Sequence, residues 1–388
     1  MKYCIIVHYH ELSLKGKNRP WFQKKLILNI RKQFTGLEFS NIKLIASRII
    51  ISDINKEKWQ QYKAILKCII GVKNSLLMAQ VKTDMKMICD ISYDIVKNCE
   101  FESFRVSARR QNKELEFTSQ DVNINVGSHI VKKLNKSVKL KNSDLTIFIE
   151  AINDSTYIGY EKVDSYGGLP IGTSESALSM LSSGIDSPVA SFEVFKRGVE
   201  LSYVHFHSSP VTSKQSIYNV ERILEVLNKY QIECNLYLIP LLEIQQHIMD
   251  KIDSKSWILL FRRAMVNISN KICQKINAKA IITGENIGQV ASQTLTNLSI
   301  VDEASSLPII RPLAGMNKEE IINKAIDINT YDISIEPYED CCSYFVPPHP
   351  ETKSNLNRIK KMEKSLEMDC LISNSLDKIE IKKMDYYE

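Results

Sequence analysis

Residues 179–191, "SMLSSGIDSPVAS", decide the fold class of the second half of this 388-residue chain. A short apolar segment is followed by a loop of small residues, and Asp186-Ser187-Pro188 marks the start of a helix. Ser187 is expected to cap this helix and Pro188 to occupy its first turn. Free backbone N–H groups then converge with the positive end of the helix dipole, so the loop is expected to bind phosphate.

The pattern around this loop alternates between strands and helices. Apolar strand candidates at 177–181, 201–206, 234–241 and 280–284 are separated by helical patterns over 187–197, 213–230 and 253–276. This alternation predicts a doubly wound, parallel α/β sheet, whose ligands bind at the carboxyl ends of the strands. The loop lacks the lysine of a Walker-type motif, which disfavours that class of NTPase.

The first half of the chain shows a different, α+β pattern. It contains strand signals at 3–9, 42–52, 103–110, 145–152 and 155–163, and helical signals at 19–34, 57–68, 84–99 and 119–134. These elements indicate mixed sheets covered by helices. Residues 164–176, small and polar with three glycines and a proline, form the best linker candidate. The predicted domains are therefore 1–58, 59–166 and 177–388, with a linker at 167–176.

Charge is distributed unevenly between the two halves. Residues 1–170 hold 28 Lys and Arg against 17 Asp and Glu, a net charge of +11, whereas residues 171–388 hold 23 against 28, a net charge of −5. This asymmetry indicates a polyanion held by the first half and modified by the second, although solvated lysines would give the same count. The candidate RNA contacts are Lys15, Lys17, Arg19, Arg105, Arg109, Arg110 and Lys113. The loop that carries Lys15, Lys17 and Arg19 could equally be an ordinary connection between a strand and a helix.

Composition excludes several classes of protein. No run approaches the roughly 18 apolar residues of a membrane span, and the N-terminus lacks a secretory cleavage site. Nine cysteines without any Cys-x-x-Cys pair predict a reducing cytoplasm and argue against a zinc ribbon. His205 and His207 would share one strand face, but no third ligand lies at a metal-site spacing, so core or nucleotide contacts are favoured and no metal site is predicted.

The loop sequence "LSSGIDSPVASFEVFKRG" resembles the PP-loop of ATP pyrophosphatases. Further stretches resemble the family of tRNA 4-thiouridine synthases, or tRNA sulfurtransferases: "VHFHSSPVTS", "TGENIGQVASQTLTNL", "IIRPLAGMNKEEI" and "EPYEDCCSYFVPPHP". At the front, "HELSLKGKNRPWF" is similar to the family's ferredoxin-like signature, and "FRVSARRQNKELEFTSQDVN" is similar to its THUMP RNA-binding domain. The resemblance covers nearly the whole chain, in family order.

The resemblance implies an ATP site made by Met180, Leu181, Ser182, Ser183, Gly184, Ser187, His205, Phe206, Arg262, Gly284 and Gln293. Such roles are physically reasonable, since the guanidinium of Arg262 can donate two parallel N–H bonds to a phosphate, and Gly284 allows its backbone to approach a ligand or a neighbouring backbone closely. Asp186 would lie near the pyrophosphate and bind Mg²⁺, or else be an ordinary carboxylate at a helix start.

The resemblance also implies the reaction and its partners. ATP activates the O4 of uridine at tRNA position 8, and a persulfide on Cys342 supplies the sulfur, with Cys341 as the alternative carrier. Without room for a rhodanese domain, a cysteine desulfurase or another donor is expected to load Cys342 directly. The resemblance also suggests the thiamine sulfur-carrier protein as a second sulfur acceptor, and a homodimer is expected. Cys341, Cys273 and Cys234 all remain candidates for the thiol that releases the product, and the spacings give no indication about an iron–sulfur cluster.

One residue departs from the family pattern. Ser183 stands where the family has glycine, and a positive φ there would cost serine about 1–2 kcal/mol, or about tenfold in ATP affinity. The competing hypothesis is therefore a THUMP-containing tRNA-binding protein with a degenerate ATP site. A third, an amide-forming PP-loop enzyme, would leave the basic first half without a purpose.

Overall fold

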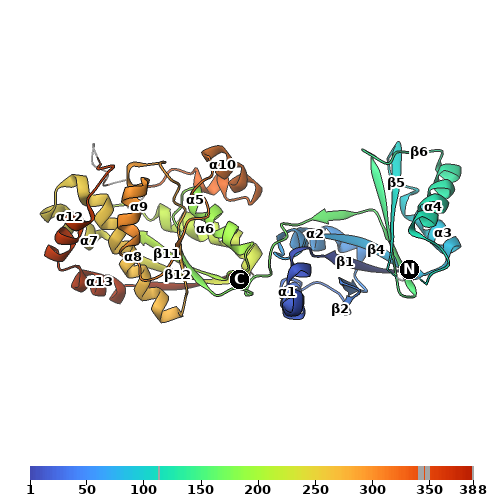
Figure 1. Ribbon diagram of the computed structural model, residues 1–388, viewed down its shortest axis with the longest axis horizontal. Helices are drawn as coiled ribbons and strands as arrows, with labels where there is room; N and C mark the ends of the chain where they lie inside the picture. Colours follow the sequence, from blue (N-terminus) through green and yellow to red (C-terminus); the bar gives the residue numbers. More distant parts are fainter. Residues whose placement is uncertain (112–113, 340–344, 346–349, 387–388) are drawn as a thin grey trace. The chain divides into compact units, whose positions relative to one another are not determined.

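The computed structural model describes residues 1–111, 114–339, 345 and 350–386 and forms two compact units, Met1–Pro170 and Ile171–Glu388 (Figure 1). The division between them falls inside the stretch 167–176, where the sequence predicts a linker. Among the described residues, no helix has the length and apolar character required to cross a bilayer.

The first unit is built on one nine-stranded sheet with the path β2-β3-β1-β4-β8-β7-β5-β6, and β9 pairs with β4 off this path. Its strands are β1 (Lys2–His8), β2 (Asn41–Ile45), β3 (Arg48–Ser52), β4 (Asn74–Lys82), β5 (Ser103–Arg110), β6 (Ser137–Val138), β7 (Leu145–Ile152), β8 (Ser155–Gly159) and β9 (Lys162–Asp164). Its helices are α1 (Arg19–Gln33), α2 (Trp59–Cys68), α3 (Met85–Val96) and α4 (Ser119–Leu134), with short 3-10 turns η1 (Glu11–Leu14), η2 (Gly16–Asn18) and η3 (Lys56–Lys58).

The first six elements confirm the predicted ferredoxin-like fold. They run β1-α1-β2-β3-α2-β4, and the strands lie in the order β2-β3-β1-β4 with antiparallel neighbours. Both helices pack on one face, where Leu26 of α1 and Tyr62 of α2 share a core with Ile5 of β1. Tyr62 thus lies in this first core, although the predicted boundary places it at the start of the second region.

The remaining strands carry α3 and α4 and form the region predicted as THUMP. Here β5 pairs in parallel with β7 and β6, while β7 pairs with β8 in the antiparallel sense. Thr118 and Asp121 form a reciprocal capping box at the start of α4, which fixes the predicted N-terminus of that helix. The result is a mixed sheet covered by helices, as the sequence indicates.

The predicted strand at 42–52 is wrong, because it is a hairpin of β2 and β3. The chain turns at Ala46 and Ser47, whose φ angles are 53° and 63°. Two consecutive left-handed residues match the twist of a tight hairpin, but asparagine and glycine usually mark such turns. The predicted strand at 155–163 is similarly divided into β8 and β9, and β4 was not predicted.

A buried polar cluster joins the ferredoxin-like strands to the THUMP strands. Glu150 of β7 is 3% exposed and pairs with Arg48 of β3 and with His8 of β1, whose Nε2 lies 2.8 Å from the carboxylate. The other ring nitrogen of His8 lies 2.9 Å from Asn74 Oδ1 on β4. Burial alone would raise the pKa of Glu150, but the hydrogen bond and charge of His8, together with Arg48, hold the pKa below its usual value.

We expect Glu150→Ala to lower the free energy of unfolding of this unit by about 3 kcal/mol, because it leaves Arg48 partly buried without its carboxylate. Hydrogen exchange of β1 and β7 amides in the full chain measures this. The loss should be complete above the unfolded pKa of about 4.3 and should shrink as the pH falls through the lower folded pKa. Glu102→Ala, at a carboxylate with 89% of its side chain exposed, should change stability by less than about 1 kcal/mol; equal effects would contradict the role of Glu150.

The second unit has a six-stranded sheet of order β14-β13-β10-β11-β12-β15. Its strands are β10 (Ala177–Met180), β11 (Leu201–His207), β12 (Glu233–Pro240), β13 (Ile281–Ile282), β14 (Ile309–Ile310) and β15 (Glu380–Asp385). Its helices are α5 (Asp186–Phe195), α6 (Gln215–Gln231), α7 (Leu242–Lys251), α8 (Trp257–Ile276), α9 (Leu295–Asp302), α10 (Lys318–Asp327), α11 (Tyr331–Ser334), α12 (Leu356–Ser365) and α13 (Met368–Asp377), with 3-10 turns η4 (Ser254–Ser256) and η5 (Ala291–Gln293).

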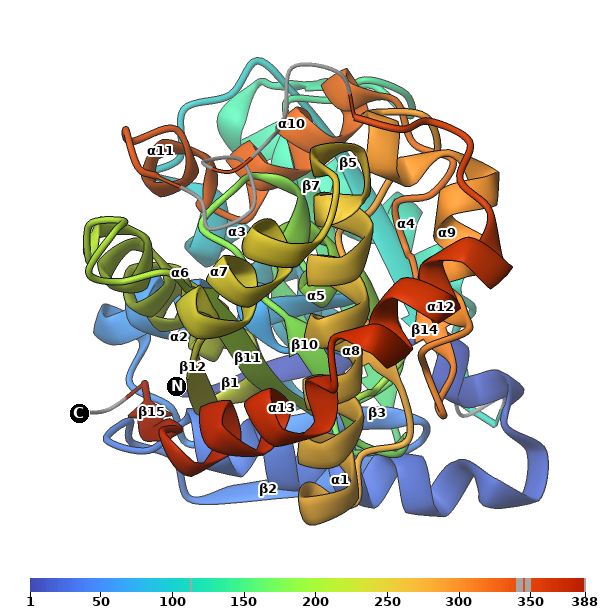
Figure 2. The same ribbon diagram turned by 90° about the vertical axis from the view of Figure 1, so that its left-hand side faces the viewer.

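This sheet confirms the predicted doubly wound class. β10 to β14 are parallel, with α7, α8 and α13 packed on one face and α5 and α6 on the other (Figure 2). The edge strand β15 runs antiparallel to β12 and was not predicted. In this sheet β11 and β12 lie on one side of β10, whereas β13 and β14 lie on its other side. The strand order therefore reverses between β10 and β13. Ligands of such sheets bind at this reversal.

Candidate nucleotide-binding site

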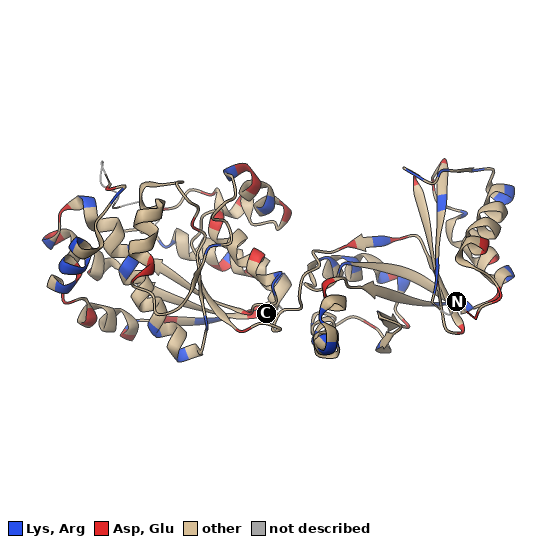
Figure 3. Cartoon of the chain, viewed as in Figure 1, with Lys and Arg blue, Asp and Glu red and all other residues tan. Residues whose placement is uncertain are grey.

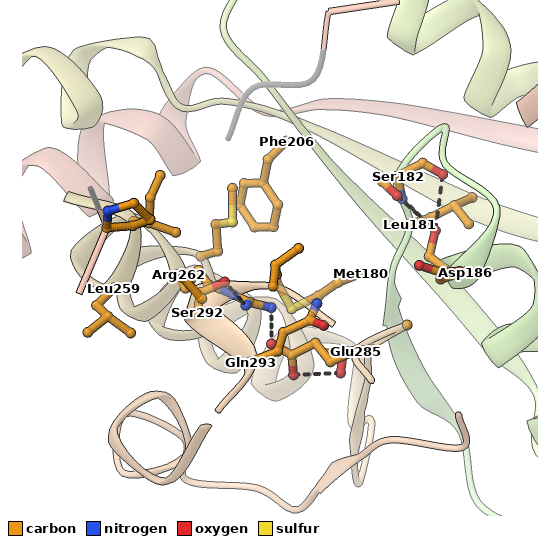
Figure 4. Close-up of a pocket in the computed structure, with 18 of the residues that line it drawn as sticks. Met180, Leu181, Ser182, Asp186, Phe206, Leu259, Arg262, Glu285, Ser292 and Gln293 are labelled. Carbon is orange, nitrogen blue, oxygen red and sulfur yellow. Dashed lines mark hydrogen bonds and ion pairs between the residues drawn. The ribbon is translucent and has the colours of Figure 1, made fainter. Parts of the chain in front are cut away.

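A cavity of about 450 Å³ opens where the strand order reverses. Its lining follows the carboxyl ends of β10, β11 and β13 and includes α8 and η5 (Figure 4). Nine of the predicted ATP-site residues line it: Met180, Leu181, Ser182, Ser187, His205, Phe206, Arg262, Gly284 and Gln293, together with Asp186. Apolar side chains such as Phe206, Leu259 and Met265 form one part and charged groups another, a combination that suits a nucleotide.

The phosphate loop is closed by a bond between its two ends. The hydroxyl of Ser187 accepts a hydrogen bond from the Ser182 N–H at 2.9 Å and donates one to the Ser182 carbonyl at 3.1 Å. The predicted capping role of Ser187 is wrong, because α5 begins one residue earlier, at Asp186, and has no side-chain cap. Ser187 instead fixes the loop and leaves N–H groups of the first helical turn without a cap.

Ser183 and Gly184 belong to this loop but do not line the cavity. Ser183 is fully buried, and it is not among the residues with a positive φ. The strain that would weaken ATP binding is therefore absent, which removes the physical basis of a degenerate site. Its buried hydroxyl has no hydrogen-bond partner among the described residues, and such a group costs about 1–3 kcal/mol of stability.

Gly284 brings two backbones into close contact, as the sequence predicts. A Cβ at this position would lie 2.6 Å from the Ser187 nitrogen and 2.8 Å from the Asp186 carbonyl carbon. Backbone at this distance leaves no room for any side chain. The loop after β13 therefore packs directly on the first turn of α5.

A buried carboxylate that the sequence did not reveal organises the charged part of the cavity. Glu285 pairs with Arg262 through one oxygen and with Arg311 at 2.6 Å through the other, and Arg262 also donates to Ser292 at 2.9 Å. Glu285 is 4% exposed. Both Glu285 and Arg311 lie within stretches that resemble the family, but a role inside a buried network depends on distant residues that only the fold brings together.

Asp186 lies at the rim and accepts hydrogen bonds from Lys318 Nζ at 2.5 Å and from Gln289 Nε2 at 3.1 Å. A single carboxylate beside a phosphate loop fits Mg²⁺ that arrives with a nucleotide, since Mg²⁺ is commonly held by one or two carboxylates and substrate phosphates. Among the residues that the structure describes, no cluster of three or more His, Cys, Asp and Glu side chains could hold a metal by itself.

The two histidines of β11 lie on the strand that pairs with β10, next to the phosphate loop. His205 Nδ1 lies 2.8 Å from the Leu181 carbonyl, so this nitrogen donates, while Nε2 lies 3.3 Å from the Ser216 hydroxyl. Burial and the neighbouring His205 lower the pKa of His207 to about 4. His205 thereby ties β11 to the start of the phosphate loop.

The candidate RNA contacts belong to the first unit, and they differ in exposure and in the contacts that their side chains make. Lys17, Arg105 and Arg109 are exposed, whereas Arg110 donates to the carbonyls of Leu115 and Phe117 and so supports its own loop. Lys15 lies over the ring of Phe22, Arg19 donates to Tyr9, and Lys113 falls outside the described residues. Basic residues also gather on α12 of the second unit (Figure 3).

Cys341 and Cys342 lie outside the described residues; the described residues before them contact the phosphate loop and the segment after β11, and those after them line the cavity. Before them, Ser334 lies 3.4 Å from the Gly184 carbonyl and Glu339 accepts a bond from the Ser213 N–H at 3.0 Å. After them, Pro350 and Glu351 line the cavity. The other candidate thiols are buried: Cys273 is 0% exposed and Cys234 is 7% exposed, and burial raises their pKa values to about 11 and about 12.

Three protein-family models match consecutive parts of the chain. The model of the thiamine biosynthesis protein (ThiI) matches residues 172–368, that of the ThiI ferredoxin-like domain matches 4–75, and that of the THUMP domain matches 82–161. A probable tRNA sulfurtransferase of Natranaerobius thermophilus is 37% identical over 99% of this chain and 96% of its own length. One from Listeria monocytogenes is 36% identical over 97% of this chain and 94% of its own.

Solved structures give a concordant result. A crystal structure of a 4-thiouridine synthetase in complex with RNA and bound ATP is similar over 99% of this chain and 100% of that chain, with a TM-score of 0.90 and 34% identity. A Pyrococcus horikoshii protein shares the fold over 85% of this chain and all of its own, with a TM-score of 0.66 and 23% identity.

Proposed function

Because the chain belongs to the thiamine biosynthesis protein (ThiI) family, we propose that it is an ATP-dependent tRNA sulfurtransferase that converts uridine at tRNA position 8 into 4-thiouridine. The observation that carries this function is the cavity at the strand reversal, which joins an uncapped helix N-terminus to an arginine and an apolar compartment. The solved relative that covers the whole chain contains both ATP and RNA.

ATP occupies this cavity as the first substrate. The apolar part, with Phe206, receives adenine, and the N–H groups around Ser187 together with Arg262 receive the phosphates. Oxygen O4 of uridine attacks the α-phosphorus, and pyrophosphate leaves. The base is then activated, because AMP is a far better leaving group than the original oxygen.

Cys342 carries the sulfur as a persulfide. Its terminal sulfur attacks C4 of the activated base and AMP leaves, so that base and cysteine are joined by a disulfide. A second thiol then attacks the sulfur of Cys342, which frees 4-thiouridine and leaves a disulfide for an external reductant. Burial and raised pKa values disfavour Cys234 and Cys273 in this role. Cys341 is the remaining candidate of the three.

The first unit holds the tRNA. Its ferredoxin-like and THUMP regions expose Lys17, Arg105 and Arg109, which contact the RNA backbone in this proposal. We place the enzyme in the cytoplasm as a homodimer, with a cysteine desulfurase as sulfur donor. Sulfur transfer to the thiamine sulfur-carrier protein is a second activity in keeping with the family, and it would use the same cavity.

Nucleoside mass spectrometry tests the main function. Cells that lack this chain should contain no 4-thiouridine in their tRNA, and restoring the intact chain should return it. With purified protein, tRNA, ATP, L-cysteine and a cysteine desulfurase, each 4-thiouridine should be matched by one AMP and one pyrophosphate. Thiolation without ATP would contradict the proposed chemistry.

We expect Asp186→Asn to raise the Mg²⁺ concentration for half-maximal activity by at least about tenfold, because the amide is a much weaker ligand than the carboxylate. Titration of pyrophosphate release against Mg²⁺ at saturating ATP measures this. Glu193→Gln is a matched control on the same helix, since Glu193 pairs with Lys324 and Lys196. An unchanged Mg²⁺ requirement in Asp186→Asn would show that Asp186 only orients the helix start.

A further inference from the structure

Glu285 is the buried centre of a chain of charged groups at the cavity wall. One carboxylate oxygen, Oε1, accepts a hydrogen bond from Arg262. The other, Oε2, accepts from Arg311 Nε at 2.6 Å and from the Thr283 hydroxyl at 3.0 Å. Arg311 is held in turn by Asp302, whose Oδ1 lies 2.5 Å from Nη2 of the arginine. Glu285 is therefore fixed through one oxygen and presents the other to Arg262.

Arg262 is held at both terminal nitrogens of its guanidinium. Nη2 donates to Glu285, and Nη1 donates to the Ser292 hydroxyl at 2.9 Å (Figure 4). All three residues line the cavity, and 18% of the Arg262 side chain is exposed. Because a guanidinium is planar and rigid, fixing two of its nitrogens fixes the direction of the whole group. The protein itself therefore sets the orientation of Arg262 in the cavity wall.

The next arginine along α8 provides a comparison within the same helix. Arg263 also pairs with two carboxylates, Glu303 at 3.0 Å and Glu363 at 2.6 Å, but it is 3% exposed and does not line the cavity. Its network joins α8 to α12 and to the end of α9, which is a structural role. The network of Arg262, in contrast, ends on a side chain that reaches the ligand cavity.

A carboxylate beside a phosphate site requires a physical reason, because its negative charge repels phosphate. Glu285 and Asp302 also balance the positive charges of Arg262 and Arg311, so these four residues together carry no net charge that would attract an anion. What the arrangement supplies is direction. An arginine that is already held in one rotamer loses less conformational entropy when it binds a ligand.

We propose that Glu285 is a positioning residue that directs the guanidinium of Arg262 toward the phosphates of ATP. This inference rests on the proposed function and concerns its first step, the binding of ATP. It also fixes the sign of an effect. Loss of the negative charge of Glu285 should strengthen ATP binding if charge alone matters, and should weaken ATP binding if Glu285 positions Arg262.

Equilibrium binding of ATP with Mg²⁺ to the full-length protein, without tRNA or a sulfur donor, tests this sign. Glu285→Gln should raise the Kd for ATP by about tenfold, because an amide has only one oxygen to accept from two arginines. Glu285→Asp keeps the charge but is one methylene shorter, so it should raise the Kd by a similar factor even if the glutamine variant folds poorly. Tighter or unchanged binding in either folded variant would overturn the inference.

A double-mutant cycle separates positioning from stability. In Arg262→Ala, which lacks the guanidinium, the addition of Glu285→Gln should change the Kd for ATP by less than about twofold. Glu363→Gln is the matched control, because it removes a carboxylate from Arg263 and Glu363 does not line the cavity. It should lower the melting temperature and leave the Kd within about twofold of the parent. Multiplied losses in the double variant, or an equal rise of the Kd in Glu363→Gln, would overturn the inference. A parent protein that does not bind ATP would instead refute the proposed function.

Discussion

Gly284→Ala is expected to lower kcat/KM for ATP by at least about 100-fold while the chain remains folded. The added methyl would lie 2.6 Å from the Ser187 nitrogen and 2.8 Å from two further backbone atoms, distances that real Cβ atoms do not adopt. All three clashing atoms are backbone, so no flexible side chain can move aside. Either the loop after β13 or the first turn of α5 must shift.

This shift acts on the phosphate-binding groups directly. Ser187, in the first turn of α5, and Arg262, which pairs with Glu285 next to Gly284, line the same cavity. Moving them apart removes convergent donors from the same phosphates, which weakens ATP binding and misaligns the α-phosphorus. Steady-state rates of pyrophosphate release at varied ATP measure the effect, and tRNA affinity should be unchanged because the first unit is untouched.

Gly315→Ala is the matched control. Gly315 lies in the same unit and has no positive φ. A Cβ added there would have no heavy atom within 4 Å apart from the glycine itself and its two chain neighbours. It should behave as the parent enzyme in rate and in thermal stability. If Gly284→Ala kept the parental kcat/KM for ATP, the close packing of the two backbones would be unnecessary for the site, and the assignment of the cavity would lose its main geometric support.

Much of the fold was predictable where local signals agree with the final structure. Helix α4 was predicted with its observed bounds, and the structure shows local signals at both ends: a capping box of Thr118 and Asp121 at its start and Asn135, with a φ of 52°, just after its end. Strands β5 and β7 were also predicted with their observed bounds. The hairpin at Ala46 and Ser47 was missed because its left-handed turn lacks the residues that usually signal one.

The same distinction between local and long-range signals applies to the candidate site. Residues next to the phosphate loop could be found because a strand, a small-residue loop and a helix start are local patterns. The role of Glu285 could not be predicted, because it depends on ion pairs with Arg262 and Arg311, which lie on other elements. The capping role expected for Ser187 was wrong because its hydroxyl bonds back to Ser182, a choice that depends on the closed shape of the loop.

Cys342→Ser is expected to reduce 4-thiouridine formation from L-cysteine and a cysteine desulfurase by at least about 1,000-fold, because a serine hydroxyl cannot carry a persulfide. Pyrophosphate release and tRNA binding should persist, since the cavity and the first unit are unchanged. Chromatography with mass spectrometry of nucleosides, run alongside a pyrophosphate assay, measures both half-reactions in the same sample.

Cys341→Ser and Cys273→Ser distinguish the roles of the thiols. If Cys341 releases the product, its loss should leave the first turnover able to form a disulfide between base and Cys342 but should slow the appearance of free 4-thiouridine, and added dithiothreitol should restore it. Cys273→Ser should keep the parental rate, because that thiol is 0% exposed and its pKa is raised to about 11. When a reductant is supplied, only the residue that bears the persulfide is indispensable. If Cys342→Ser kept full thiolation and Cys341→Ser lost it, the persulfide carrier would therefore be Cys341.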